Sequence, residues 1–141
     1  MLKIFKYLFI TIIFLTTNLI SAENLNYNKG MKFYEEKDYD NAKINFEKVI
    51  VYDPKNEKSY LYLATIFNKK EKKALEKNNL DTVLLLNPKN EEATYRLAEL
   101  YIVQSDFLKS KNLIKKLKKI CNKFCTSINK LEEKLVAASK K

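Results

Sequence analysis

The acidic residues and the two cysteines are the side chains of this sequence whose types could support catalysis or metal binding. The sequence has no histidine and only one glycine among its 141 residues. Catalytic triads and metal sites that use an imidazole are therefore excluded, and one glycine cannot build a phosphate-cradling loop. Two cysteines alone cannot complete a structural zinc site. We therefore expect no catalytic, cofactor-binding or metal-binding residues.

Three pairs of glutamates could in principle share acid–base work, but each pair is adjacent in sequence: Glu35 and Glu36, Glu91 and Glu92, and Glu132 and Glu133. Adjacent residues of a helix point in different directions, so these pairs are interpreted as solvated surface. The sequence favours a binding module over an enzyme.

A short segment occurs twice in the sequence and indicates where the helices that would hold any binding residues begin and end. Residues 53–57 read Asp-Pro-Lys-Asn-Glu, and residues 87–91 read Asn-Pro-Lys-Asn-Glu, 34 positions later. Pro54 and Pro88 are the only prolines of the chain. Proline cannot continue a helix, whereas the Asn-Glu that follows offers a helix N-cap and an acid in the first turn. The pattern predicts that one helix ends and another begins at this interval.

Small and large residues recur at the same interval. The small residues are Gly30, Ala64 and Ala98, and an aromatic residue follows each of them three positions later: Phe33, Phe67 and Tyr101. A small residue lets a second helix approach closely, and the aromatic residue fills the same seam one turn later. Each small residue is therefore predicted to lie between paired helices.

With this period and these residues, the chain resembles a tetratricopeptide repeat (TPR) protein of the small exported bacterial type. Residues 37–42, Lys-Asp-Tyr-Asp-Asn-Ala, closely match the family's turn between helices and the start of its second helix. The resemblance implies an all-α, right-handed TPR solenoid of three antiparallel helix pairs plus a C-terminal capping helix. The implied organisation is a signal peptide at 1–22, TPR 1 at 23–56, TPR 2 at 57–90, TPR 3 at 91–124, and the capping helix and tail at 125–141.

The second repeat departs from the family pattern. Residues 71–73, Glu-Lys-Lys, replace the usual turn, and Glu76 takes the close-contact site that Ala42 and Ser110 hold in the other repeats. The start of the fourth helix is therefore left open.

The first 22 residues have the pattern of a secretory signal peptide. Lys3 and Lys6 precede an almost continuous apolar run over residues 7–15, and Ala22 supplies a small residue before Glu23. Cleavage after Ala22 is expected, and the alternative is an uncleaved membrane anchor. With cleavage, the mature protein is expected to be soluble and exported, and the periplasm is the expected location.

In an exported protein, Cys121 and Cys125 are expected to form a disulfide. Their spacing within a continuous helix would hold the side chains too far apart. A helix break near residues 122–124 is therefore predicted, with Thr126 or Ser127 capping a new helix. A redox-active pair is the alternative, although the spacing is not that of a Cys-x-x-Cys motif.

In the TPR family, function lies on the concave surface formed mainly by the first helix of each pair. A groove for a peptide or helix, aromatic and apolar with few charges, is therefore expected. Its predicted residues are Tyr27, Met31, Tyr34, Leu61, Thr65, Asn68, Tyr95, Glu99 and Ile102. For Leu61 and Ile102, a place in the core is an equal alternative.

The family's mode of clamping a C-terminal carboxylate is not expected. Tyr27, Met31 and Tyr62 stand where its polar residues would be, and only Arg96 is suitably basic. The function predicted from the sequence is thus a non-catalytic periplasmic scaffold that binds a protein or peptide partner. An accessory role in exported-protein maturation, such as cytochrome c assembly, is a further alternative.

The net formal charge of +10 leaves one more alternative, an adaptor on the cell envelope that makes a weak contact with anionic lipid or cell wall. The lysines that would form its surface are Lys109, Lys111, Lys115, Lys116, Lys118, Lys119 and Lys123. The richness in Lys, Asn and Ile is also what an AT-rich genome favours. No nucleic-acid partner is expected, because the protein is expected to be exported and has a single arginine, the residue that reads phosphates and bases in bidentate fashion.

Overall fold

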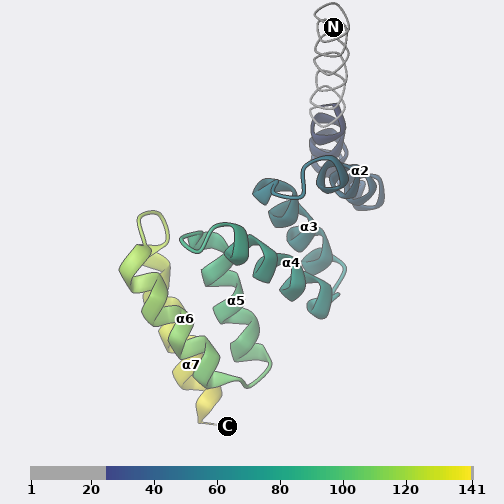
Figure 1. The fold of residues 1–141 in the computed structure, drawn as a ribbon. Coiled ribbons are helices and arrows are strands. Elements are labelled where there is room, and N and C mark those ends of the chain that lie inside the picture. The colour runs from purple at the N-terminus through teal and green to yellow at the C-terminus, as the bar shows by residue number, and fades with distance from the viewer. Residues whose placement is uncertain (1–24, 141) are drawn as a thin grey trace, which may run out of the picture. The chain divides into compact units, whose positions relative to one another are not determined.

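The computed structural model describes residues 25–140, which are helical apart from short turns. Residues 25–35 form a helix, and seven further helical elements follow: α2 (Tyr39–Tyr52), α3 (Glu57–Lys69), α4 (Lys73–Leu86), α5 (Glu91–Val103), α6 (Phe107–Ile120), the short 3-10 helix η1 (Cys125–Ser127) and α7 (Ile128–Ser139) (Figure 1). None of the described helices has the length and apolar character needed to cross a bilayer. The signal peptide predicted for residues 1–22 lies outside the described residues.

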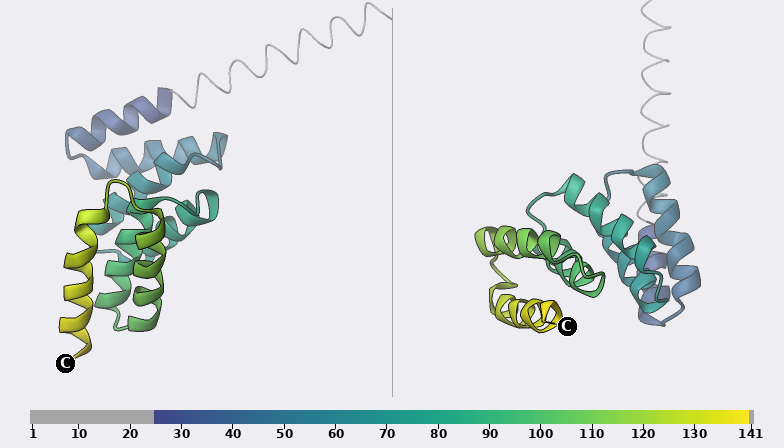
Figure 2. Two further views of the ribbon diagram at one scale, coloured as in Figure 1. Left: turned by 90° about the vertical axis from the view of Figure 1, so that its left-hand side faces the viewer. Right: turned by 90° about the horizontal axis from the view of Figure 1, so that it is seen from below.

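The chain divides into two compact units, with the boundary between Ser59 and Tyr60 in the first turn of α3. The first unit holds the helix at 25–35 and α2. The second holds the rest of α3 and the helices α4 to α7, whose antiparallel succession can be followed in two views (Figure 2).

The helix bounds repeat to the residue at an interval of 34. The helices α2, α4 and α6 begin at Tyr39, Lys73 and Phe107, and α3 and α5 begin at Glu57 and Glu91. The fourth helix, whose start the sequence left open, therefore begins in register with its equivalents. The atypical residues 71–73 therefore leave the backbone geometry of this turn unchanged.

Three matching turns explain this register. Lys37, Glu71 and Ser105 adopt positive φ angles of 63°, 57° and 59°. In each turn, the N–H of that residue donates to the carbonyl three positions earlier at 3.0 Å, and the next N–H donates to the carbonyl five positions earlier at 2.9 Å. This pair of bonds is the Schellman motif, in which a residue in the left-handed region ends a helix. The same backbone bonds thus end the first helix of each pair.

The side chains that start the next helix differ between the turns. Asp38 and Asp106 accept hydrogen bonds from the backbone N–H of Asn41 and Lys109, whereas Lys72 at the same position of α4 provides no capping hydrogen bond. Since an N-cap side chain satisfies one of the unpaired N–H groups of a helix, the start of α4 lacks a contribution that the equivalent starts have.

The two proline-containing connections are also equivalent. Asp53 and Asn87 accept a hydrogen bond from the backbone N–H two residues later, at 3.0 and 3.1 Å. Asn56 and Asn90 then accept from the backbone N–H three residues later, at 3.0 and 2.8 Å. The N-cap role predicted for the asparagine after each proline is confirmed.

Gly30 shows why the first unit needs a small residue at the predicted seam. A Cβ atom on Gly30 would lie 3.0–3.1 Å from ring atoms of Phe46, which is fully buried on α2. This distance is below ordinary van der Waals contact. The other core residues of α2, Ala42 and Val49, are also fully buried.

Two clusters form the core of the second unit. In the first, Ala64 of α3 packs with Leu80 and Val83 of α4 and with Leu97 of α5. In the second, Ala98 of α5 packs among buried residues of α6 and α7: Ile114, Leu117, Ile128 and Leu131. Ala64 and Ala98 are fully buried, so both occupy the tightly packed seam that the sequence predicts. The helix α7 covers the second cluster, as expected for a capping helix.

The connection between α6 and α7 contains the two cysteines. The helix α6 ends at Ile120, and the Cα atoms of Cys121 and Cys125 are 5.2 Å apart, with their sulfur atoms at disulfide distance. The predicted helix break is therefore present. Ser127 occupies the N-cap position of α7, but its side chain makes no capping hydrogen bond.

Glu91, the first residue of α5, supports this connection from outside. Its carboxylate accepts hydrogen bonds from the backbone N–H groups of Lys123 and Phe124 at 2.9 and 3.0 Å. The backbone N–H groups of Asn122, Phe124 and Lys123 hold the pKa of Glu91 below its ordinary value. A carboxylate of α5 thus accepts from a connection that has Asn122 at the position of the prolines and Phe124 at the position of the capping asparagines of the other two connections.

Candidate binding site

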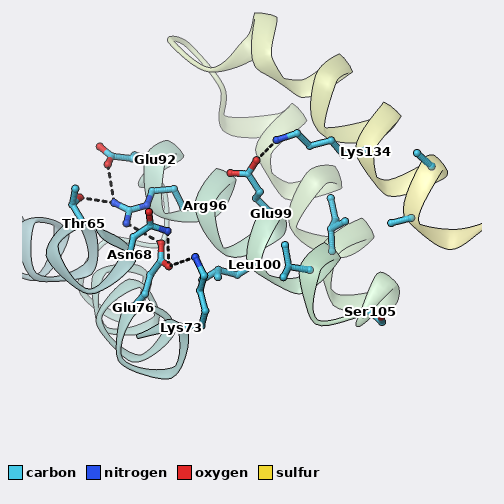
Figure 3. Close-up of a pocket in the computed structure, with 14 residues that line it drawn as sticks. Thr65, Asn68, Lys73, Glu76, Glu92, Arg96, Glu99, Leu100, Ser105 and Lys134 are labelled. Carbon is cyan, nitrogen blue, oxygen red and sulfur yellow. Dashed lines mark hydrogen bonds and ion pairs between the residues drawn. The ribbon is translucent and has the colours of Figure 1, made fainter. Parts of the chain in front are cut away.

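A hollow of about 920 Å³ lies on the second unit, over α3, α4, α5 and α7 (Figure 3). It is lined by Thr65, Asn68, Lys73, Glu76, Glu92, Arg96, Glu99, Leu100, Ile102, Val103, Ser105, Lys134, Ala137 and Ala138. Its lining residues form one strongly polar end, a bridging ion pair and one apolar end.

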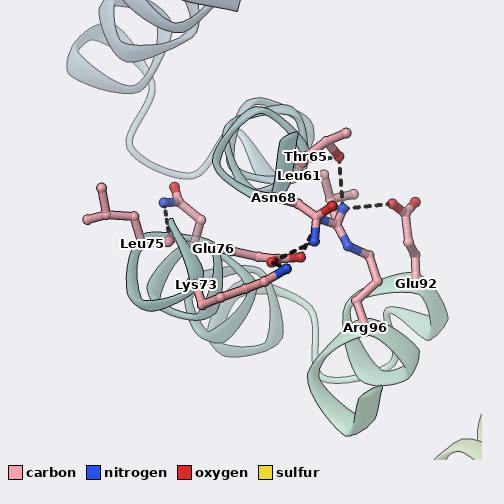
Figure 4. A network of polar contacts seen from close by, with 9 residues as sticks. Leu61, Thr65, Asn68, Lys73, Leu75, Glu76, Glu92 and Arg96 are labelled. Carbon is pink, nitrogen blue, oxygen red and sulfur yellow. Dashed lines mark hydrogen bonds and ion pairs between the residues drawn. The ribbon is translucent and has the colours of Figure 1, made fainter. Parts of the chain in front are cut away.

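Arg96 organises the polar end. One terminal nitrogen of its guanidinium donates to the hydroxyl of Thr65 at 2.8 Å and lies 3.3 Å from the carboxylate of Glu92. The other donates to Glu76 at 3.0 Å (Figure 4). Arginine suits this role because its planar guanidinium presents several donors in fixed directions. The contacts with Thr65 and Glu76 connect α5 to α3 and α4, and together with Glu92 they fix the guanidinium.

Glu76 is the buried partner in this network, with a side chain only 2% exposed. One of its carboxylate oxygens accepts from Arg96, and the other accepts from the amide of Asn68 at 2.8 Å. The ammonium of Lys73 lies 3.7 Å away. A buried carboxylate is costly unless it is paired and hydrogen-bonded, and here both oxygens have partners.

An ion pair connects α5 to the capping helix across the hollow. Lys134 of α7 donates to the carboxylate of Glu99 on α5 (Figure 3). This hydrogen bond is the main cause of a raised pKa for Lys134. The two side chains are 43% and 37% exposed, so the pair is accessible to an incoming partner.

The other end of the hollow is apolar. Leu100 and Ile102 are buried there, whereas Val103 is 71% exposed. Ala137 and Ala138 of α7 line the same end and offer only methyl groups. Small side chains beside an exposed valine leave room for an apolar side chain of a partner.

Among known proteins, only solved structures are similar to this chain. No family model matches the chain, and no curated protein matches its sequence. The first TPR of Spaghetti (RPAP3), bound to an HSP90 peptide, is similar over 84% of this chain and 94% of its own, with 18% identity and a TM-score of 0.73. The chain has the fold of a TPR domain.

Two further solved structures support the assignment of the TPR fold. The Arabidopsis OM64 TPR domain is 16% identical over 84% of this chain and 98% of its own, with a TM-score of 0.72. The Yersinia enterocolitica type III secretion chaperone SycD, in complex with a peptide of the translocator YopD, is 16% identical over 82% of this chain and 91% of its own, with a TM-score of 0.70. The all-α TPR fold class predicted from the sequence is confirmed.

Within this TPR fold, four of the predicted groove residues line the hollow: Thr65, Asn68, Glu99 and Ile102. Leu61 instead packs against the first core cluster of the second unit. The ring of Tyr95 packs against that of Phe124, with centroids 5.4 Å apart, and belongs to the second cluster. Leu61 and Tyr95 therefore support the core of this unit and do not line the hollow.

The remaining predicted groove residues lie in the first unit. The ring of Tyr27 packs edge-on against Phe46, and that of Tyr34 packs edge-on against Tyr39, each with centroids 5.8 Å apart. Met31 is half-buried. A shared groove between these residues and the hollow stays a prediction.

The chemical character of the hollow differs from the aromatic, weakly charged groove that the sequence predicts. No aromatic residue lines it, and six of its residues are charged, three acidic and three basic. The predicted groove was based on residue spacing in the first helix of each pair. That spacing cannot show that a side chain of a second helix, such as α4, also lines the hollow. Glu76 of α4 is such a side chain. A large charged residue at a position where the other repeats have small residues was the sequence feature that could have indicated this polar site.

Proposed function

We propose that this protein is a non-catalytic interaction scaffold of the bacterial periplasm, which holds a peptide or helix of another protein against α3, α5 and α7. The hollow on the second unit is the observation that carries this proposal. It combines exposed polar groups with an apolar end, and such a surface fits a segment that carries both kinds of side chain. TPR structures similar to this chain include two solved with bound peptides.

The hollow also supports the view that the partner is not held by a carboxylate clamp. Arg96, the only arginine, already contacts Glu76 and Glu92. A guanidinium that is committed to two carboxylates within the protein has less positive potential to offer a third. We infer that a partner contacts the exposed side chains of the hollow, and that Arg96 maintains the shape of its floor.

The periplasmic part of the proposal rests on the sequence of the first 22 residues. Mass spectrometry of the protein recovered from its native host tests it, with cleavage expected between Ala22 and Glu23. Recovery of the intact N-terminal peptide in the mature pool would favour a membrane anchor instead.

Crosslinking in the periplasm followed by capture of the tagged protein tests the scaffold function. Val103→Lys combined with Ala137→Lys would fill the apolar end, and both positions are exposed, so folding should be unaffected. We expect this variant to lose the partner that the wild type captures. The matched control is Leu85→Lys combined with Val51→Lys, at positions that are 82% and 76% exposed and do not line the hollow. Retention of the partner by the first variant would contradict the proposal.

An envelope-surface adaptor is a second candidate, favoured by the exposure of the lysines on α6. Of the seven lysines named for that surface, all but the half-buried Lys116 are exposed. Association with anionic vesicles would weaken steeply as salt is raised, whereas binding at the apolar end of the hollow would persist. A salt series with both ligands separates the two candidates.

A further inference from the structure

A second groove lies between α6 and α7, on residues that do not line the hollow of the proposed scaffold function. Its volume is about 750 Å³, and α6 and α7 run side by side in both views of Figure 2. The residues that line it are Phe107, Leu108, Lys111, Asn112, Ile114, Lys115, Lys118, Glu132, Leu135, Val136 and Ser139.

The repeat register shows what kind of element fits this groove. Glu132 and Leu135 of α7 stand 34 positions after Ala98 and Tyr101 of α5. On α5 this face is covered by the following helix, because Ala98 packs among residues of α6 and the ammonium of Lys109 lies 5.2 Å from the centre of the Tyr101 ring. The equivalent face of α7 is open. The groove therefore has the geometry of a seat for one more helix.

The floor and edges of the groove present apolar surface. Leu108 is 72% exposed and Val136 is 51% exposed, on opposite sides of the groove, and the half-buried Leu135 and the buried Ile114 lie beside them. Large apolar side chains exposed in one place mark an interaction surface more often than scattered ones do. An amphipathic helix would bury this surface with its apolar stripe.

The charges of the groove indicate which charge the flank of a bound helix should carry. Three lysines line it against one acid, Glu132, which is already paired with Lys118 at 2.8 Å. Lys111 and Lys115 form no ion pair with any of residues 25–140, and they are one helical turn apart. A partner that places carboxylates opposite them gains complementarity. A second copy of this chain, with a net formal charge of +10, fits that requirement poorly.

We propose that the groove between α6 and α7 binds an acidic amphipathic helix of a partner protein. The apolar stripe of the helix lies against Leu108 and Val136, and its acidic flank faces Lys111 and Lys115. This site is separate from the hollow over α3, α5 and α7, so the protein presents two binding surfaces.

Three synthetic helices with the same leucine stripe and with acidic, neutral or basic flanks test the proposal on the full protein. Fluorescence anisotropy should give micromolar affinity for the acidic helix and at least about tenfold weaker binding of the other two. Lys111→Glu combined with Lys115→Glu should reverse the preference toward the basic helix. Lys116→Glu combined with Lys119→Glu changes the net charge equally on the same helix and should leave the preference unchanged.

An apolar variant and a lipid control complete the test. Leu108→Asn combined with Val136→Asn, at exposed positions, should weaken the acidic helix about tenfold or more without loss of the helical circular-dichroism signal. The proposal is overturned if no helix binds, or if both lysine pairs weaken binding equally. It is also overturned if phosphatidylglycerol vesicles bind and compete with the helix while the asparagine variant binds it normally, since a diffuse lysine surface for lipid would then explain the data.

Discussion

The guanidinium of Arg96 lies 3.0 Å from the carboxylate of Glu76, a residue that is 2% exposed at a position where the other repeats have Ala42 and Ser110. A small side chain at that position allows close packing of paired helices. A glutamate there directs its carboxylate toward Asn68 and Arg96. One repeat has thus exchanged close apolar contact for a buried polar network, and this network forms the floor of the candidate binding site.

Breaking the network should be costly. We expect Arg96→Leu to destabilise the protein by about 3–5 kcal/mol, because it leaves Glu76 buried without its main partner. Glu76→Ala with Arg96→Leu removes both charges and should recover much of that loss. Chemical denaturation of the three proteins measures this difference. Glu47→Gln, which breaks the surface pair between Lys43 and Glu47, should cost no more than about 0.5 kcal/mol. Equal stability of Arg96→Leu and wild type would show that the pair is unimportant.

Glu91 should make the attachment of the capping helix sensitive to acid. The backbone N–H groups of Asn122, Phe124 and Lys123 lower its pKa from the ordinary value of 4.5. A lowered carboxyl pKa contributes stability that is present above the unfolded-state pKa and lost as the pH falls through the folded-state pKa. An NMR titration should therefore place the Glu91 carboxyl below 4.5.

Substitution isolates this effect. Glu91→Gln should reduce stability at neutral pH and remove part of the decline seen on acidification, whereas Glu133→Gln, at an exposed position of α7, should do neither. An unshifted Glu91 titration in the folded protein would contradict the assigned role.

The missing cap of α4 can be supplied. Lys72→Asp should stabilise the protein by about 1 kcal/mol, because an aspartate in this position can accept a backbone N–H as Asp38 and Asp106 do. It also places negative charge at the positive end of the helix dipole. Lys72→Ala is the matched control that removes the lysine without adding an acceptor. Thermal unfolding of the two variants should separate them, and identical melting temperatures would refute the capping argument.

The cysteine pair should be oxidised in the mature protein. Thiol labelling of unfolded, unreduced protein should find no free thiol, and reduction should destabilise the protein by about 2 kcal/mol, toward the low end of the usual range because the closed loop is short. The double variant Cys121→Ser, Cys125→Ser should behave like the reduced protein. Two reactive thiols per chain would show that the sulfur atoms are close but unbonded.

Periodic features were readily predicted from the sequence, and features that depend on contacts across helices were not. The proline connections and the small residues at 30, 64 and 98 predict helix pairs because they constrain the backbone and the seam locally. The aromatic groove was predicted from the first helices alone. Tyr95 instead packs on Phe124, a residue beyond the end of α6, and no spacing rule connects these two positions.

The ion pair between Glu76 and Arg96 at the polar end of the hollow was missed for the same reason. Glu76 departed from the repeat pattern and Arg96 is the only arginine, but they are 20 residues apart on different helices. A charged residue at a small-residue site and the only arginine of the chain would each need a partner if buried. This shared need for a buried partner is the signal in the sequence that connects Glu76 with Arg96.

The positive φ angles of Lys37, Glu71 and Ser105 reverse the usual link between exposure and mutational tolerance. All three side chains are exposed, and substitutions at exposed positions are ordinarily neutral. Here the backbone sets the limit: glycine and asparagine enter the left-handed region readily, whereas valine and isoleucine resist it. In a library of single variants, these three surface positions should therefore disfavour valine and isoleucine more strongly than other exposed positions do, because the limit is set by the backbone and not by side-chain volume.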